Sequence, residues 1–446
     1  MKTILELAAN LLAGKTSSRA ITEAALAKID DPAGEGARTY IKVYREAALA
    51  EAKASDNLRK HGIVPSPLAG LPISLKDLFD VAGDVTMAGV KAHANYPAAT
   101  HDAPIVARLR AAGAVIIGRT NLSPLAFSPL GINPDFGTPG NPADRSRVPG
   151  GSSSGAAVSV TDGMAVAAIG SDTGGSIRMP AAFCGLAGIK PTQKRVPLDQ
   201  TWPLSSSLDS VGPLCVSVSC CALVDAALAG EPIELPPVLP LKGLRFALPT
   251  MAVLDGMDAT VAKAFQRSLT ALSKAGAQII EVPMPELSDV IAIWRSPPTL
   301  TQIEGYAANK KRLAEHPEAY DANIKARMMV GATATAVEYL YLQHLRADII
   351  KRANKATAPF DAVIMPTVQF VAPTIKEVSD PVGFKHIVPL TIRNPSIVNL
   401  LDRCAISIPC HQKGELPVGL SLMGEHGGDR RLLAIGMAVE AALKHA

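Results

Sequence analysis

Units of a helix, a glycine and a buried strand recur along the chain and predict an α/β protein. Residues 104–112 have a basic and apolar helical pattern, and the β-branched run at 114–118 follows after one glycine. A second unit joins an apolar helical face between 261 and 272 to a strand at 278–282. Units of this kind favour a sheet that is covered by helices on both faces.

The remaining pattern extends this sheet and places one long loop. Residues 3–60 are mostly helical, with alanine-rich stretches at 20–28 and 46–54, and longer helices are expected near 299–357. Prolines recur between 121 and 149 and exclude a regular helix or a central strand there, and loops of this length usually carry function. Further strands are predicted at 72–76, 361–366, 404–408 and 417–422, and a closing helix at 429–444.

The chain of 446 residues is predicted to form a single domain over 1–446. Its parts are a helical region at 1–60, a glycine- and serine-rich core at 61–230, and a second half at 231–446 that completes the sheet and the substrate pocket. The proline-rich stretch at 231–242 is the best candidate for a boundary, which we interpret as a subdivision within one fold.

Composition narrows the class of protein. Hydrophobic residues make up 48% and charged residues 19% of the chain, as in well-packed soluble proteins. The net charge of +4 comes from scattered basic residues, so a nucleic-acid partner is not predicted. The absence of eighteen consecutive apolar residues and of an apolar leader predicts a cytoplasmic protein without a membrane partner.

Metal and cofactor sites are not predicted either. The six cysteines lack the paired spacing of zinc sites and of disulfide frameworks, and buried free thiols are the better interpretation. The nine histidines form no H-E-x-x-H motif, which argues against a zinc hydrolase. We therefore expect chemistry without a metal or an organic cofactor.

Lys76, at the end of the predicted strand 72–76, is the first candidate for catalysis. Burial disfavours the charged amine and lowers its pKa. Half of the amine is neutral at pH 7 if the pKa falls by about 3.4 units from about 10.4, which costs about 4.6 kcal/mol. The alternative is a lysine that extends from the strand end into solvent. Asp77 would keep Lys76 protonated if the two met, but adjacent strand residues point to opposite faces.

Two glycine-rich segments supply candidate serines. Residues 149–155 form a turn that leads into a helix, and a helix cap is as good an interpretation as a functional one. The segment matches G-x-S-x-G, which would make Ser153 a nucleophile, but that motif must follow a hydrophobic strand and polar residues stand there. Residues 170–178 run from a strand into paired glycines. Their N–H groups can approach a developing oxyanion beside Ser176, and no phosphate-binding motif is present.

Together these segments resemble the amidase signature family. Gly-Leu-Pro-Ile-Ser-Leu-Lys-Asp at 70–77, Pro-Gly-Gly-Ser-Ser-Ser-Gly at 149–155 and Gly-Ser-Asp-Thr-Gly-Gly-Ser-Ile-Arg at 170–178 occur in the family's order. Similar stretches at 188–192, 207–213 and 416–420 extend the resemblance over nearly the whole chain. The resemblance implies a large, mixed, mostly parallel sheet that is enclosed by helices on both faces.

The resemblance also assigns roles. It implies that Ser176 is the acylated nucleophile, that Ser152 relays the proton on a cis peptide bond after Gly151, and that Lys76 is the general base. A serine hydroxyl can donate and accept at once, as a relay requires. The implied oxyanion hole consists of the N–H groups of Thr173, Gly174, Gly175 and Ser176. Substrate contacts are expected from Ala126, Ser152 and Phe127, and Arg178 either binds substrate or braces the loop.

Three hypotheses follow from this resemblance. The first is an amidase that cleaves a small carboxamide, and the second is the glutaminase subunit of a tRNA-dependent amidotransferase with a tight protein partner. Residues 121–127 lack the acidic residue that is usual in those subunits, which favours the first. The third is a non-catalytic scaffold or receptor on the same fold. Interfaces between identical subunits leave no sequence motif, so a homodimer stays open.

Overall fold

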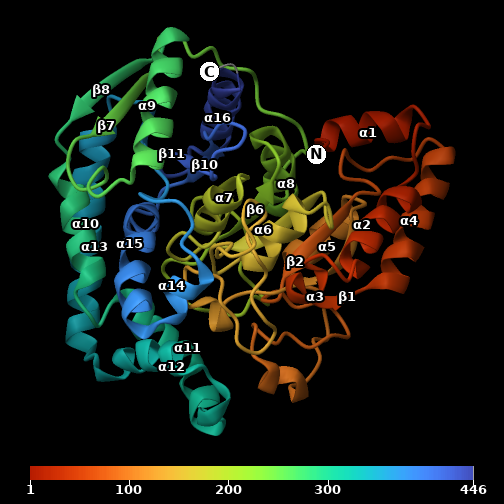
Figure 1. The fold of residues 1–446 in the computed structure, drawn as a ribbon, viewed down its shortest axis with the longest axis horizontal. Coiled ribbons are helices and arrows are strands. Elements are labelled where there is room, and N and C mark those ends of the chain that lie inside the picture. The colour runs from red at the N-terminus through yellow and green to blue at the C-terminus, as the bar shows by residue number, and fades with distance from the viewer. Residues whose placement is uncertain (445–446) are drawn as a thin grey trace.

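An eleven-stranded sheet runs through the whole protein in a computed structural model that describes residues 1–444 (Figure 1). The strand order is β1-β3-β2-β4-β6-β5-β10-β11-β9-β7-β8, so strands from both halves of the chain share one sheet. The strands are β1 Tyr40–Val43, β2 Pro72–Lys76, β3 Val115–Thr120, β4 Ala167–Ser171, β5 Ala187–Lys190, β6 Val211–Cys215, β7 Arg245–Pro249, β8 Gln278–Val282, β9 Ala362–Pro366, β10 Ala405–Pro409 and β11 Gly419–Met423.

The sheet is mixed, as predicted, but its expected parallel majority is not found. Parallel pairing joins β3-β2-β4 on one side and β9-β7-β8 on the other. The central run β4-β6-β5-β10-β11-β9 is antiparallel throughout, and β1 adds an antiparallel edge to β3. Parallel neighbours need a crossover connection, which is usually a helix. In the centre, β5 and β6 follow each other in the chain without a helix between them, as do β10 and β11, and both pairs are antiparallel.

Helices cover both faces of this sheet (Figure 1). Helices α5, α8, α9 and α16 pack with sheet residues such as Ile73 and Ile406 in one core, and α6 and α7 pack with Ala168 and Leu214 in another. The α-helices are α1 Ile4–Leu12, α2 Ser18–Asp30, α3 Gly36–Thr39, α4 Arg45–Lys60, α5 Pro104–Ala111, α6 Ser154–Thr161, α7 Arg178–Cys184, α8 Val218–Ala229, α9 Ala259–Lys274, α10 Pro285–Arg295, α11 Leu300–Glu315, α12 Ala322–Met329, α13 Ala336–Thr357, α14 Ile375–Ser379, α15 Pro381–Leu400 and α16 Asp429–Leu443.

The predicted elements correspond closely to these ranges. The strand predicted at 72–76 is β2, the run at 114–118 begins one residue before β3, and the strand at 278–282 is β8. The stretch 121–149 is irregular apart from one 3₁₀ turn, Pro124–Ala126, as expected from its prolines. Strands β1, β5, β6 and β7 were not predicted. Within residues 1–444 no helix is both long and apolar enough to cross a bilayer.

Candidate active site

The parallel pairing of β2 with β4 brings three of the candidate residues to one edge of the sheet. Leu75 pairs with Ile169, so Lys76 and Ser171 stand together at the carboxyl ends of the two strands. Ser176 follows β4 in the turn before α7, and Ser152 lies just before α6. Carboxyl ends of parallel strands are a common place for active sites, because the loops that leave them converge.

Lys76 is fully buried and forms two hydrogen bonds, both to hydroxyl groups. Its Nζ lies 2.7 Å from Ser152 Oγ and 2.8 Å from Ser171 Oγ. Burial lowers the pKa of Lys76 to about 7, against the opposing effect of the Asp172 and Asp209 carboxylates. A large neutral fraction at physiological pH follows, as a general base requires.

The neighbouring Asp77 does not pair with Lys76. Its carboxylate points to the other side of β2 and forms an ion pair of 2.6 Å with Arg119, and both side chains are buried. Alternation along the strand therefore separates the acid from the amine, as expected from the sequence.

The serine-rich loop brings Ser152 beside Lys76 and the turn that carries Ser176. The Gly151–Ser152 peptide bond is cis, as the resemblance implies. The Ser153 N–H donates to the backbone oxygen of Ser176 at 3.3 Å, and Ser152 is fully buried. Gly151 cannot carry a side chain, because a Cβ there would collide with Gly131 and Ser123.

The turn at 173–176 carries the four N–H groups that were predicted as an oxyanion hole, and one of them already has an acceptor. The Gly175 N–H donates to Asp172 Oδ1 at 2.8 Å and is therefore occupied. Within residues 1–444 the N–H groups of Thr173, Gly174 and Ser176 have no such acceptor. Gly175 serves the turn in another way: its φ of 119° and its close approach to Pro395 both require glycine.

Arg178 is part of a buried network and does not line the pocket. Its Nε lies 3.1 Å from Asp172 Oδ2 and its Nη2 lies 3.0 Å from Asp172 Oδ1. Asn399 joins both residues, since it accepts from Arg178 at 2.7 Å and donates to Asp172 at 2.9 Å. Burial would raise the pKa of Asp172, but Arg178 and Asn399 lower it to about 2. Of the two predicted roles for Arg178, the geometry favours bracing the loop.

A second buried carboxylate, which was not predicted, supports the other side of the turn. Asp209 accepts from Thr173 Oγ1 at 2.5 Å and from the N–H groups of Leu204 and Ser205 at 2.9 Å. Burial raises the pKa of Asp209 to about 6, against these hydrogen bonds. The contact fixes Thr173 relative to the loop that carries Leu204, which also lines the pocket.

A small pocket of about 30 Å³ opens onto Ser176. Thr173 and Gly174 form one side of it, and the predicted residues Ala126 and Phe127 form another. The second half of the chain contributes Trp294, Thr301, Arg327 and Ile392, and the first half also contributes Ser128, Pro129, Met179 and Leu204.

Arg327, on α12, is the charged residue of this pocket and was not predicted. Its Nη1 donates to the Phe127 carbonyl at 2.7 Å, and its guanidinium lies 4.6 Å from the centre of the Phe127 ring. Within residues 1–444 it has no ion pair with a carboxylate. Burial lowers the pKa of Arg327 to about 10, so it stays cationic at neutral pH. A lone arginine in a polar helix gives no signal in the sequence.

Comparison with known proteins agrees with this geometry. Residues 20–433 match the profile of the amidase family. The chain belongs to the amidase signature family. As a member of this family, the protein is an amidohydrolase that acts on amide C–N bonds. A solved structure described as an amidase is 34% identical, with a TM-score of 0.88 over 99% of both chains.

Two relatives differ in their described activity. A glutamyl-tRNA(Gln) amidotransferase subunit from Thioalkalivibrio sulfidiphilus is 35% identical, and the match covers 97% of this chain and 96% of that relative. The 2-amino-5-chloromuconic acid deaminase of Comamonas testosteroni is also 35% identical, over 89% of this chain and 86% of its own. These comparisons therefore establish the family but not the substrate.

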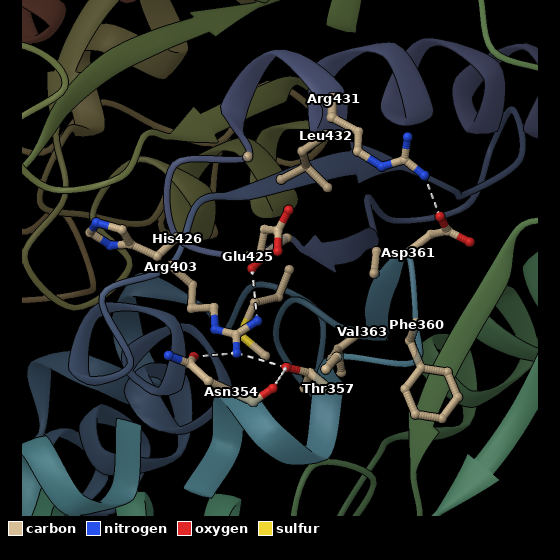
Figure 2. A pocket seen from close by; sticks show the side chains of 15 residues that line it. Asn354, Thr357, Phe360, Asp361, Val363, Arg403, Glu425, His426, Arg431 and Leu432 are labelled. Atoms are coloured by element: carbon tan, nitrogen blue, oxygen red, sulfur yellow. Dashed lines mark hydrogen bonds and ion pairs between the residues drawn. The ribbon is translucent and has the colours of Figure 1, made fainter. Parts of the chain in front are cut away.

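A larger cavity of about 410 Å³ lies elsewhere in this amidase, between the end of α13 and the start of α16 (Figure 2). It contains no serine and no lysine. Arg403, which is buried there, donates to Asn354 Oδ1 at 2.6 Å, to Thr357 Oγ1 at 2.7 Å and to the Gly424 carbonyl (Figure 2). Arg403 thus joins α13 to the loop after β11. No group of three or more His, Cys, Asp or Glu side chains within residues 1–444 could hold a metal ion.

Removal of the Arg178 charge should lower the stability of the protein. In Arg178→Met the carboxylate of Asp172 stays buried without its cation, and we expect a loss of about 3–5 kcal/mol in the free energy of unfolding. Urea unfolding followed by circular dichroism measures this loss. The double variant with Asp172→Asn should recover part of it.

The matched control is Arg145→Met, because Arg145 forms a half-exposed ion pair with Asp162. Its cost should stay below about 1 kcal/mol. Equal losses in Arg178→Met and Arg145→Met would show that the buried network does not stabilise the fold.

Proposed function

We propose that this protein hydrolyses a small carboxamide to a carboxylate and ammonia or an amine through an acyl-enzyme on Ser176. The main support is the hydrogen bond of 2.7 Å between Ser152 and a buried Lys76 whose pKa is about 7, beside the pocket that Ser176 lines. An amine in this state can accept a proton from a hydroxyl, which an ordinary lysine cannot do at neutral pH.

The proposed reaction moves one proton along the two serines. Ser176 Oγ attacks the carbonyl carbon while its proton passes to Ser152 Oγ, and the Ser152 proton passes to Lys76 Nζ. The N–H groups of Thr173, Gly174 and Ser176 stabilise the oxyanion, and one such donor is worth about 3–4 kcal/mol. The C–N bond then breaks as the proton returns through Ser152 to the leaving nitrogen. Water, activated along the same path, releases the acid and restores Ser176.

The pocket favours a substrate with a short acyl part that carries a carboxylate. Its volume is about 30 Å³, so we expect a short acyl group to fit it better than a bulky one. Arg327 brings a cation without a carboxylate partner to this pocket, and a guanidinium binds a carboxylate through paired hydrogen bonds. The relative from Comamonas testosteroni is named for an acid substrate, which agrees with this preference.

A second candidate is the glutaminase subunit of a tRNA-dependent amidotransferase. Its support is the 35% identity to such a subunit over 97% of this chain. It uses the same chemistry and differs in requiring a partner protein. A stable complex with another protein on purification, together with glutamine hydrolysis only in that complex, would favour it. Turnover of amides by the isolated chain would favour the first candidate.

We also propose a cytoplasmic location. The six cysteines are all buried and free, as is usual where thiols are kept reduced. The third hypothesis, a scaffold without catalysis, has less support, since Lys76 is hydrogen-bonded to Ser152 and Ser176 lines a pocket.

Ser176 and Lys76 should be necessary for turnover. We expect Ser176→Ala to reduce hydrolysis of aliphatic and aryl amides to background, and Lys76→Ala to lower kcat by about 10²–10⁴-fold while the fold is retained. Ammonia or amine release measures activity, and circular dichroism checks the fold. A fluorophosphonate should label the native protein and spare Ser176→Ala. Near-normal rates in either variant would refute the assigned roles.

The reaction should depend on pH through Lys76. The base must be neutral, so kcat/KM is low below the pKa of Lys76 and rises as pH increases through about 7. The profile from pH 5 to 9 on a neutral amide measures this rise. The residual activity of Lys76→Ala serves as the control and should lose the rise. A profile that falls between pH 6 and 8 would contradict a lysine base.

Arg327 should select for anionic substrates. In Arg327→Met an unbranched, flexible stem is kept and the charge is lost, so we expect KM for a carboxylate-bearing amide to increase about 10- to 100-fold, as for the loss of a charged hydrogen bond. A neutral amide of the same size should be affected little.

The matched control for this selectivity is Arg312→Met, because the Arg312 guanidinium stacks 4.2 Å above the Trp202 ring and does not line the pocket. It should leave both KM values unchanged. Equal effects of Arg327→Met on the charged and the neutral amide would contradict carboxylate recognition.

A further inference from the structure

Lys76 has a second hydroxyl partner that the proposed reaction does not use. Ser171, the last residue of β4, lies 2.8 Å from Lys76 Nζ through its Oγ and is buried. Within residues 1–444, Lys76 forms no ion pair, so its polar contacts are this hydroxyl and that of Ser152. We propose that Ser171 is a positioning residue that orients the amine of Lys76 toward Ser152, an inference that rests on the proposed function.

The reason lies in the shape of a neutral amine. It has two N–H bonds and one lone pair, and the lone pair must face Ser152 to take its proton. An N–H must then point to the Ser171 hydroxyl, which accepts it. Without this acceptor the Nζ group can rotate, and the lone pair faces Ser152 for only part of the time. Ser171 therefore selects the reactive rotation.

The same hydroxyl serves the other half of the proton transfer. Once Lys76 has accepted the proton, its ammonium donates to both Ser152 and Ser171. A hydrogen bond to a charged group is stronger than one to a neutral group. Ser171 thus stabilises the charged state in a site where burial disfavours it, and the nearby carboxylates of Asp172 and Asp209 act in the same direction.

The fold holds Ser171 firmly for this task. It pairs with Val211 of β6 in the antiparallel ladder, and its carbonyl accepts from Ser153 Oγ at 3.3 Å. Ser171 therefore contacts both Lys76 and the loop that carries Ser152. Thr120, at the end of the other neighbouring strand, turns its hydroxyl to the Leu75 carbonyl and does not take this place.

The test compares Ser171→Ala with Ser171→Thr, which keeps the hydroxyl. The matched control is Ser74→Ala, because Ser74 lies on β2, is fully buried and bonds to the hydroxyl of Ser159 at 2.9 Å without touching Lys76. The readout is the rate at which a fluorophosphonate labels Ser176 between pH 5 and 9. Turnover of an amide is measured in parallel. Labelling needs no knowledge of the substrate.

We expect Ser171→Ala to lower the labelling rate and kcat by about 10- to 100-fold, with KM unchanged, because Ser171 does not line the pocket. The rise of the rate with pH should move to lower pH, since the ammonium loses an acceptor while Asp172 and Asp209 remain and Asp77 stays paired with Arg119. Ser171→Thr should recover most of the rate, and Ser74→Ala should behave as the native protein.

Two results would overturn the inference. One is a native rate and an unmoved pH profile in Ser171→Ala. The other is an equal loss in Ser171→Ala and Ser74→Ala without a shift in pH, which would indicate a general packing defect. In either case the native protein still labels at Ser176, so the proposed function stands. A native protein whose labelling does not depend on Ser176 would instead contradict the proposed function itself.

Discussion

The proposed chemistry of this protein depends on the burial of one amine, that of Lys76. A lysine in water holds its proton at neutral pH, and only the loss of solvent lowers the pKa of Lys76 to about 7. A charged amine that is buried without a carboxylate partner normally destabilises a protein, because a buried ionic group needs polar or charged partners to replace water. Here two hydroxyls provide it and leave the amine neutral for much of the time. A lysine with this pKa therefore requires a strand end that the rest of the protein shields from solvent on every side.

The second requirement is that the carboxylates near Lys76 are paired with side chains other than Lys76. Asp77 is held by Arg119 on the far face of β2, and Asp172 is held by Arg178 and Asn399. If either carboxylate reached Lys76, it would keep the amine protonated. The buried ion pairs thus do more than stabilise the fold, because they keep the carboxylates from holding Lys76 in its protonated form, which is not a base. Asn399, on α15, also ties the second half of the chain to this arrangement.

Much of the candidate site could be predicted from the sequence, because its residues lie in three short segments that together resemble one family, although each segment alone left alternatives open. The run before Lys76 is apolar apart from Ser74, and the paired glycines before Ser176 allow an unusual backbone. The central antiparallel strands were missed or misjudged since β5 and β6 are short and contain glycine or proline, which weakens any strand pattern. The Gly175 N–H was assigned to the oxyanion although Asp172 accepts it, because sequence does not reveal which N–H a neighbouring carboxylate takes.

Arg327 and Ser171 were missed for a different reason, because each acquires its proposed role only through contacts in the folded protein. The same contacts separate the residues proposed for the reaction from those proposed to select the substrate. Ser171 is an ordinary serine at a strand end, and its contact with Lys76 exists only because β2 and β4 are parallel neighbours. The groups to which we assign the proposed reaction all lie between residues 76 and 176, at one edge of the sheet. The pocket beside them also takes Trp294, Thr301, Arg327 and Ile392 from α10, α11, α12 and α15 of the second half. A change in those helices can alter the accepted amide without disturbing the buried lysine. This division explains how relatives with similar cores have names that describe different reactions.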